Sequence, residues 1–177
     1  MLNSVLSAQL RPGDILAVTV AELRFPYQEW IDAHAAYLRQ LAQLCATYSA
    51  TLLIIADVPM LRAQGNLCLT PASLPLCDTP LHDAVAVDWD LHEAMDEAYA
   101  ALERSEPNVV FANSTWMYGL LCDVHGSDPR NNGAAVCSAA VPGTTAPMYI
   151  DTHHLNTQGS LYLAPFIECF LRERGLL

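Results

Sequence analysis

Short apolar runs alternate with segments of helical periodicity along this chain. Three runs are rich in β-branched or other apolar residues and adjoin turn residues, which predicts buried strands: Ile15 to Val20, Leu52 to Ala56 and Asn108 to Ala112. Three longer segments repeat apolar residues with a period near 3.6, which predicts amphipathic helices: Gln28 to Tyr48, Asp88 to Glu103 and Ser160 to Arg174. The alternation of strand and helix predicts an α/β fold with a parallel sheet and helices on its faces.

Two segments between these elements show neither an apolar run of this kind nor a helical period. Arg62 to Pro80 and Leu120 to Pro147 are rich in turn-forming residues and are predicted to be long loops. Loops of this length in a small domain are usually stapled or functional. The chain has no internal repeat and no low-complexity segment that would indicate a linker.

Composition indicates one folded domain, over residues 1–177, and argues against two kinds of partner. Hydrophobic residues make up 53% of the chain and charged residues 15%, so burial of apolar surface can offset the entropy of ordering. Nineteen acidic and eight basic residues give a formal net charge of -11, which predicts no nucleic-acid binding. The apolar runs fall short of the roughly 20 residues that span a bilayer. Met1 to Gln9 lacks the regions of a signal peptide.

Four of the six cysteines lie in the two predicted loops. Cys68 with Cys77, and Cys122 with Cys137, would each close a short loop, and a bridge across about 15 residues contributes roughly 3 kcal/mol in the chain-entropy model. Disulfides of this kind predict an extracytoplasmic location, and six reduced thiols are the alternative. The irregular spacing disfavours a zinc site. The two remaining cysteines are predicted to be buried free thiols on helix faces: Cys45 and Cys169.

The densest cluster of reactive side chains is Asp151-Thr152-His153-His154, just before the last predicted helix. An imidazole can take a proton from a serine hydroxyl near neutral pH when a carboxylate holds its ring in the right tautomer. Asp151 lies three residues before His154, which is the length of one tight turn. Asp151 and His154 are therefore candidates for the Asp-His pair of such a site, although a lone Asp-x-x-His spacing also occurs by chance. The alternative is a surface turn that caps the last helix.

A metal site is a competing use of the same cluster. His153 and His154 with Asp151 could supply ligands, joined by His82 or His125. Adjacent histidines in an extended backbone point in opposite directions, and no further ligand stands at a defined spacing. The sequence therefore predicts no metal at this loop.

The residues around the pair resemble a known family. Tyr149 to Gly159 is similar to the closing motif of SGNH hydrolases and acyltransferases of the kind fused to acyltransferase-3 type membrane proteins. That motif is an aromatic residue, Asp-x-x-His-Leu-Ser, two residues, then Gly and a helix, and here Asn156 stands in place of Ser. Leu10 to Ile15 and Leu52 to Pro59 are similar to earlier turns and strands of the family, so the resemblance covers most of the chain.

The resemblance implies a three-layer α/β/α, flavodoxin-like fold that is incomplete at its N-terminus. The family's nucleophilic serine lies in a Gly-Asp-Ser type motif, which this chain lacks, and Ser4 and Ser7 have no such context. The chain also lacks an assignable oxyanion-hole donor. Three explanations stay open: the C-terminal part of a longer, membrane-anchored protein; a degenerate relative that binds glycans without turnover; or a different nucleophile or unrelated chemistry.

The function that the resemblance implies is O-acyl, usually acetyl, transfer or ester hydrolysis on cell-surface carbohydrate, with no cofactor. His154 would act as general base and then general acid, while Asp151 orients the imidazole and stabilises the imidazolium. The expected partner is a carbohydrate or acyl-ester substrate outside the cytoplasm. The alternative is a catalytically inactive SGNH-like domain that binds carbohydrate or another partner.

Overall fold

The structure is a computed structural model, and it describes residues 9–19, 28–61, 68, 70, 72–80, 89–122 and 136–177. The chain divides into two compact units. The first comprises Met1–Asp57 and Asp88–Ser114, and the second comprises Val58–Val87 and Thr115–Leu177. The expectation of one domain over residues 1–177 stays a prediction.

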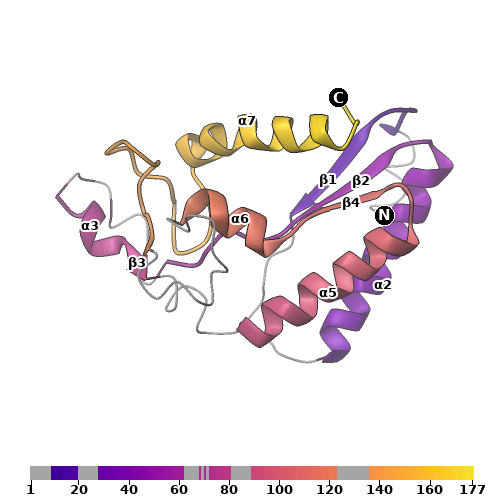
Figure 1. The fold of residues 1–177 in the computed structure, drawn as a ribbon, viewed down its shortest axis with the longest axis horizontal. Coiled ribbons are helices and arrows are strands. Elements are labelled where there is room, and N and C mark those ends of the chain that lie inside the picture. The colour runs from indigo at the N-terminus through magenta and orange to yellow at the C-terminus, as the bar shows by residue number, and fades with distance from the viewer. Residues whose placement is uncertain are drawn as a thin grey trace. The chain divides into compact units, whose positions relative to one another are not determined.

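A three-stranded parallel sheet of order β1-β2-β4 forms the centre of the first unit (Figure 1). Its strands are β1 (Ile15–Thr19), β2 (Thr51–Ile55) and β4 (Val109–Ala112). Ile15 lies opposite Thr51, and Leu52 lies opposite Val109. The predicted α/β class with a parallel sheet is therefore confirmed. The flavodoxin-like layering and the missing first strands stay a prediction.

Two helices pack on one face of this sheet (Figure 1). They are α2 (Gln28–Thr47), which contacts β2, and α5 (Trp89–Ser105), which contacts β4 and α2. Side chains from all of these elements form one buried apolar cluster, which includes Leu38, Leu52, Ile54, Tyr99 and Phe111. The predicted strands and helices of this unit are confirmed to within two residues at each end. Asp88, predicted to begin the second helix, lies outside the described residues.

A helix that the sequence pattern did not predict, α6 (Ser114–Leu121), follows β4. Its residues are apolar on nearly every side, so it has no amphipathic stripe that a period of 3.6 would reveal. The carboxylate of Asp96, on α5, accepts hydrogen bonds from the Ser114 backbone N–H at 3.2 Å and from Ser114 Oγ at 3.0 Å. The backbone N–H at the start of α6, which has no partner within the helix, is therefore satisfied by an acceptor 18 positions earlier in the sequence.

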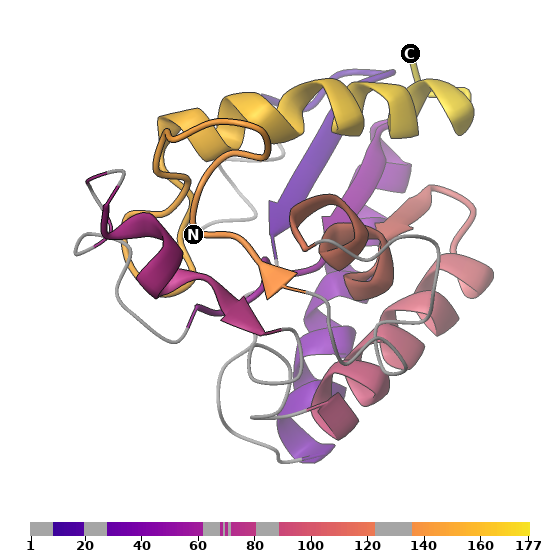
Figure 2. The same ribbon diagram turned by 60° about the vertical axis from the view of Figure 1, so that its left-hand side comes forward.

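The second unit holds the two cysteine-containing segments and the last helix. Its elements are α3 (Leu74–Cys77), β3 (Thr79–Pro80), β5 (Val136–Cys137), α7 (Thr157–Glu173) and the part of α6 after Ser114. β3 and β5 pair antiparallel (Figure 2), with Thr79 opposite Cys137. The backbone N–H of Ala139 also donates to Asp78 Oδ1 at 2.9 Å. The two predicted loops are thus joined by a small sheet.

Both predicted disulfides form, Cys68–Cys77 and Cys122–Cys137. They are consistent with an extracytoplasmic protein. Cys45 is a buried free thiol, as predicted. The prediction for Cys169 was wrong, because its thiol is exposed; the buried residues of α7 are Gly159, Leu163 and Leu171, and Cys169 does not lie on their face.

Among the described residues, no helix combines the length and the apolar character that crossing a membrane requires.

Candidate active site

The predicted site residues lie in a tight loop between Tyr149 and Leu155, which form an antiparallel bridge. The loop closes with a hydrogen bond from the Ile150 N–H to the His154 carbonyl at 2.8 Å. A second tether comes from the segment that follows β2 in the chain, because the Leu61 N–H donates to the Thr152 carbonyl at 2.7 Å. Backbone hydrogen bonds therefore fix both the base and the tip of the loop.

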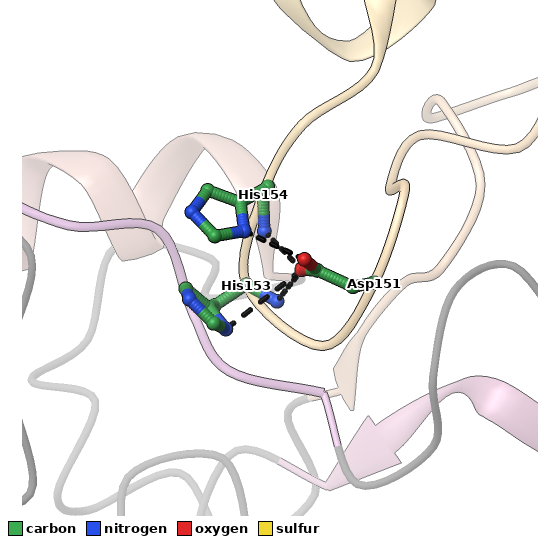
Figure 3. A group of neighbouring side chains, drawn as sticks. All are labelled: Asp151, His153 and His154. Carbon is green, nitrogen blue, oxygen red and sulfur yellow. Dashed lines mark hydrogen bonds and ion pairs between the residues drawn. The ribbon is translucent and has the colours of Figure 1, made fainter.

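Asp151 shapes this loop and orients the imidazole at the same time (Figure 3). Its Oδ1 accepts the backbone N–H groups of His153 at 2.9 Å and His154 at 2.8 Å, which is an Asx-type turn. Its Oδ2 lies 2.6 Å from Nδ1 of His154. The structure thus brings together the two residues that the sequence predicted as a pair, while their catalytic role stays a prediction.

The ionisation of Asp151 follows from these contacts. Partial burial removes water from the carboxylate and by itself would raise its pKa. Hydrogen bonds from the His153 N–H, the His154 imidazole and the His154 N–H outweigh that effect, together with the His154 charge, so the pKa of Asp151 lies well below its ordinary value. The carboxylate is therefore ionised at neutral pH and can only accept hydrogen bonds.

The negative charge of the Asp151 carboxylate determines the tautomer of neutral His154. A carboxylate that only accepts requires the proton of a neutral imidazole to be on Nδ1, so the lone pair is on Nε2. Figure 3 shows Nε2 on the side of the ring away from Asp151. The side chain of His154 is 63% exposed, so most of it faces solvent. This arrangement is the one that a general base requires.

His153 lies beside His154 and not on the opposite side of the loop. The two ring centroids are 4.0 Å apart, and Nδ1 of His153 lies 3.0 Å from Thr152 Oγ1 and 3.7 Å from Asp151 Oδ1. The expectation that adjacent histidines diverge was wrong, because it assumed an extended backbone and the backbone here turns around the Asp151 carboxylate. His82 and His125, considered as further ligands, lie outside the described residues.

Asn156 begins α7 directly after the loop. Its Oδ1 accepts the backbone N–H groups of Gln158 at 2.8 Å and Gly159 at 3.0 Å, and its Nδ2 donates to the Pro147 carbonyl at 2.9 Å. Asn is as favourable an N-cap residue as Ser, so Asn156 supplies the cap that starts α7. The helix therefore begins at Thr157, three residues before the predicted start. Asn followed by a helical stretch was a signal for this boundary.

Gly159 allows the loop to pack against the first turn of α7. A Cβ at this position would lie 2.5 Å from the Met148 carbonyl oxygen and 2.6 Å from Met148 Cγ. The Met148 carbonyl also accepts the Asn156 N–H at 2.9 Å, so it cannot move without disturbing the helix cap. The sequence placed Gly159 before the helix, whereas it lies within the first turn.

We expect Gly159→Ala to lower the free energy of unfolding by about 1–3 kcal/mol, the usual cost of forcing extra volume into a packed contact. Urea denaturation followed by circular dichroism measures the loss. Gly119→Ala is the matched control, because Gly119 is also helical and an added Cβ there meets no atom within 4 Å. That control should stabilise the protein by about 0.5–1 kcal/mol. Equal effects at the two positions would contradict the close approach.

A serine that would complete a triad is not found among the described residues. Within them, no serine hydroxyl hydrogen-bonds to His154. Ser114 is 1% exposed, and its hydroxyl donates to Asp96. Ser4 and Ser7 lie outside the described residues. The described site therefore consists of a carboxylate paired with Nδ1 of an exposed imidazole.

The fold and the loop define an α/β protein with a carboxylate-oriented histidine immediately before a helix. Comparisons of the chain with family models, with curated proteins and with solved structures gave no match.

Proposed function

We propose that this chain contributes the Asp-His half of an SGNH-type site for O-acyl transfer or ester hydrolysis on carbohydrate. The observation that supports this most directly is the 2.6 Å contact between Asp151 Oδ2 and Nδ1 of His154, with Nε2 on the side of the ring away from Asp151. The motif from Tyr149 to Gly159 supports the same proposal from sequence. In this proposal the parallel sheet belongs to a three-layer, flavodoxin-like domain.

In the proposed reaction, Nε2 of His154 takes the proton of a serine hydroxyl while the serine oxygen attacks the acyl carbonyl. Collapse of the tetrahedral intermediate breaks the ester bond, and the leaving alkoxide takes the proton back from Nε2. A carbohydrate hydroxyl or water then attacks the acyl-serine by the same proton path, which gives a transferred acyl group or free acid. Asp151 stabilises the imidazolium in both halves. No cofactor takes part.

The nucleophilic serine comes from outside the described residues in this proposal, as it would if the chain were part of a longer, membrane-anchored protein. The two disulfides support action on the extracytoplasmic side, where glycan substrates are found. The net charge of -11 favours uncharged acyl sugars over polyanionic substrates.

The test uses the full gene product as its host makes it. A serine-directed phosphonate should label one serine, and acetyl-ester hydrolysis should fall by at least about 10³-fold in His154→Ala, because triad residues act as a unit. His34→Gln is the matched control. His34 lies on α2, where its Nδ1 is 2.6 Å from the Tyr99 hydroxyl, and it takes no part in the loop, so hydrolysis should be retained.

Absence of both labelling and hydrolysis in a gene product that still binds acylated glycan would contradict the enzymatic proposal. It would favour the alternative of a non-catalytic carbohydrate-binding domain. Hydrolysis that survives His154→Ala unchanged would show that another residue is the base.

A further inference from the structure

Three side chains of types that can bind metal ions converge in the loop before α7 (Figure 3). Asp151, His153 and His154 each offer one ligand atom, and these atoms all lie within 4.8 Å of one another. Both Nδ1 atoms face the Asp151 carboxylate, at 3.7 Å for His153 and 2.6 Å for His154. Each side chain is at least one-third exposed, so an ion can enter from solvent.

We propose that Asp151, His153 and His154 bind Zn²⁺ through the carboxylate and the two Nδ1 atoms. Two imidazole nitrogens and one carboxylate oxygen are ligands that zinc accepts, and three protein ligands leave the fourth tetrahedral position for water. With bonds near 2.0–2.1 Å, tetrahedral ligand atoms lie about 3.3 Å apart. The two Nδ1 atoms lie 3.7 Å and 2.6 Å from the Asp151 carboxylate, on either side of that value.

Hydrogen bonds within and to the loop already hold the ligands in place. The loop backbone is held by the Ile150 N–H to His154 carbonyl bond and by the Leu61 tether, and Asp151 is fixed by two backbone N–H groups. Such hydrogen bonds to a ligating carboxylate orient it and limit the entropy lost when the ion binds. Zinc would replace the Thr152 hydroxyl as the partner of His153 Nδ1. The net charge of -11 further favours a cation.

Zinc at this site would also change which ring nitrogen of His154 carries the proton. Coordination by Nδ1 requires that nitrogen to be unprotonated, so the proton of the neutral ring is on Nε2. An imidazole with Nε2–H cannot take a proton from a serine hydroxyl. Zinc bound here would therefore inhibit the proposed reaction. This inhibition rests on the proposed function, whereas the proposal that zinc binds does not.

The test titrates zinc chloride into the purified 177-residue chain with its disulfides intact. Isothermal titration calorimetry should show saturable binding that weakens by at least about tenfold in His153→Ala, since ligand removal should cost no less than loss of an outer-shell partner. His153→Ala keeps the backbone N–H that donates to Asp151, so the loop remains closed. Cys169→Ser is the control, because it removes an exposed thiol close to Glu173 and should leave the zinc affinity unchanged.

NMR of the unmodified protein gives a second measurement that needs no variant. The ring signals of His153 and His154 should shift together on zinc addition, while those of His34 stay in place. Unshifted His153 and His154 signals at saturating zinc, or equal affinity of wild type and His153→Ala, would overturn the metal site. Zinc binding in a gene product without esterase activity leaves the metal site standing and removes the proposed function. Esterase activity without zinc binding removes the metal site and leaves the proposed function standing.

Discussion

Asp151→Asn is expected to lower acetyl-ester hydrolysis by the full gene product by about 10³–10⁴-fold, the scale of the same change in serine proteases. An asparagine Oδ1 can still accept the N–H groups of His153 and His154, so the turn is kept. The amide NH₂ then occupies the place of Oδ2 and donates to Nδ1 of His154. This places the ring proton on Nε2, where it prevents proton abstraction.

Nitrogen-15 NMR separates this effect from unfolding. In the wild-type chain the neutral His154 ring should carry its proton on Nδ1, and in Asp151→Asn on Nε2, with backbone amide signals of the loop nearly unchanged. Asp151→Ala is the comparison, because it loses the backbone acceptor as well and should disturb those amide signals. Full activity in Asp151→Asn would mean that the carboxylate only shapes the loop.

Removing the Cys122–Cys137 bridge should destabilise the protein by about 3 kcal/mol, because it releases a loop of 15 residues in the unfolded chain. The double variant Cys122→Ala/Cys137→Ala tests this by urea denaturation. The cost should also appear as weaker pairing of β3 with β5, since Cys137 is part of that short sheet. A two-stranded sheet of this size has little stability of its own.

Reductant provides the matched comparison for the disulfide. Dithiothreitol should lower the stability of the wild-type chain by more than that of the double variant, which keeps only the Cys68–Cys77 bridge. Cys169→Ser should behave as wild type, because Cys169 is a free thiol. An unchanged free energy of unfolding in the double variant would contradict a structural role for the bridge.

The parts of the fold that depend on local patterns were predictable. β2 and β4 are continuous apolar runs, and nearly all of their residues are buried, as is typical of parallel strands. α2 and α5 have the periodicity of helices that cover a sheet. α6 was missed because its residues are apolar on nearly every side and its first N–H is satisfied by Asp96, a contact between distant positions. The pairing of β3 with β5 was missed for the same kind of reason.

The sequence by itself placed Asp151 and His154 within one tight turn, and the resemblance of the motif around them favoured the pairing that the structure shows. It also indicated both disulfide pairs, since each closes a short loop. Only the tertiary structure decided that His153 lies on the same side as His154, because residue spacing does not specify whether a backbone is extended or turned. The close contact of Gly159 with Met148 was likewise decided by packing between the loop and the helix.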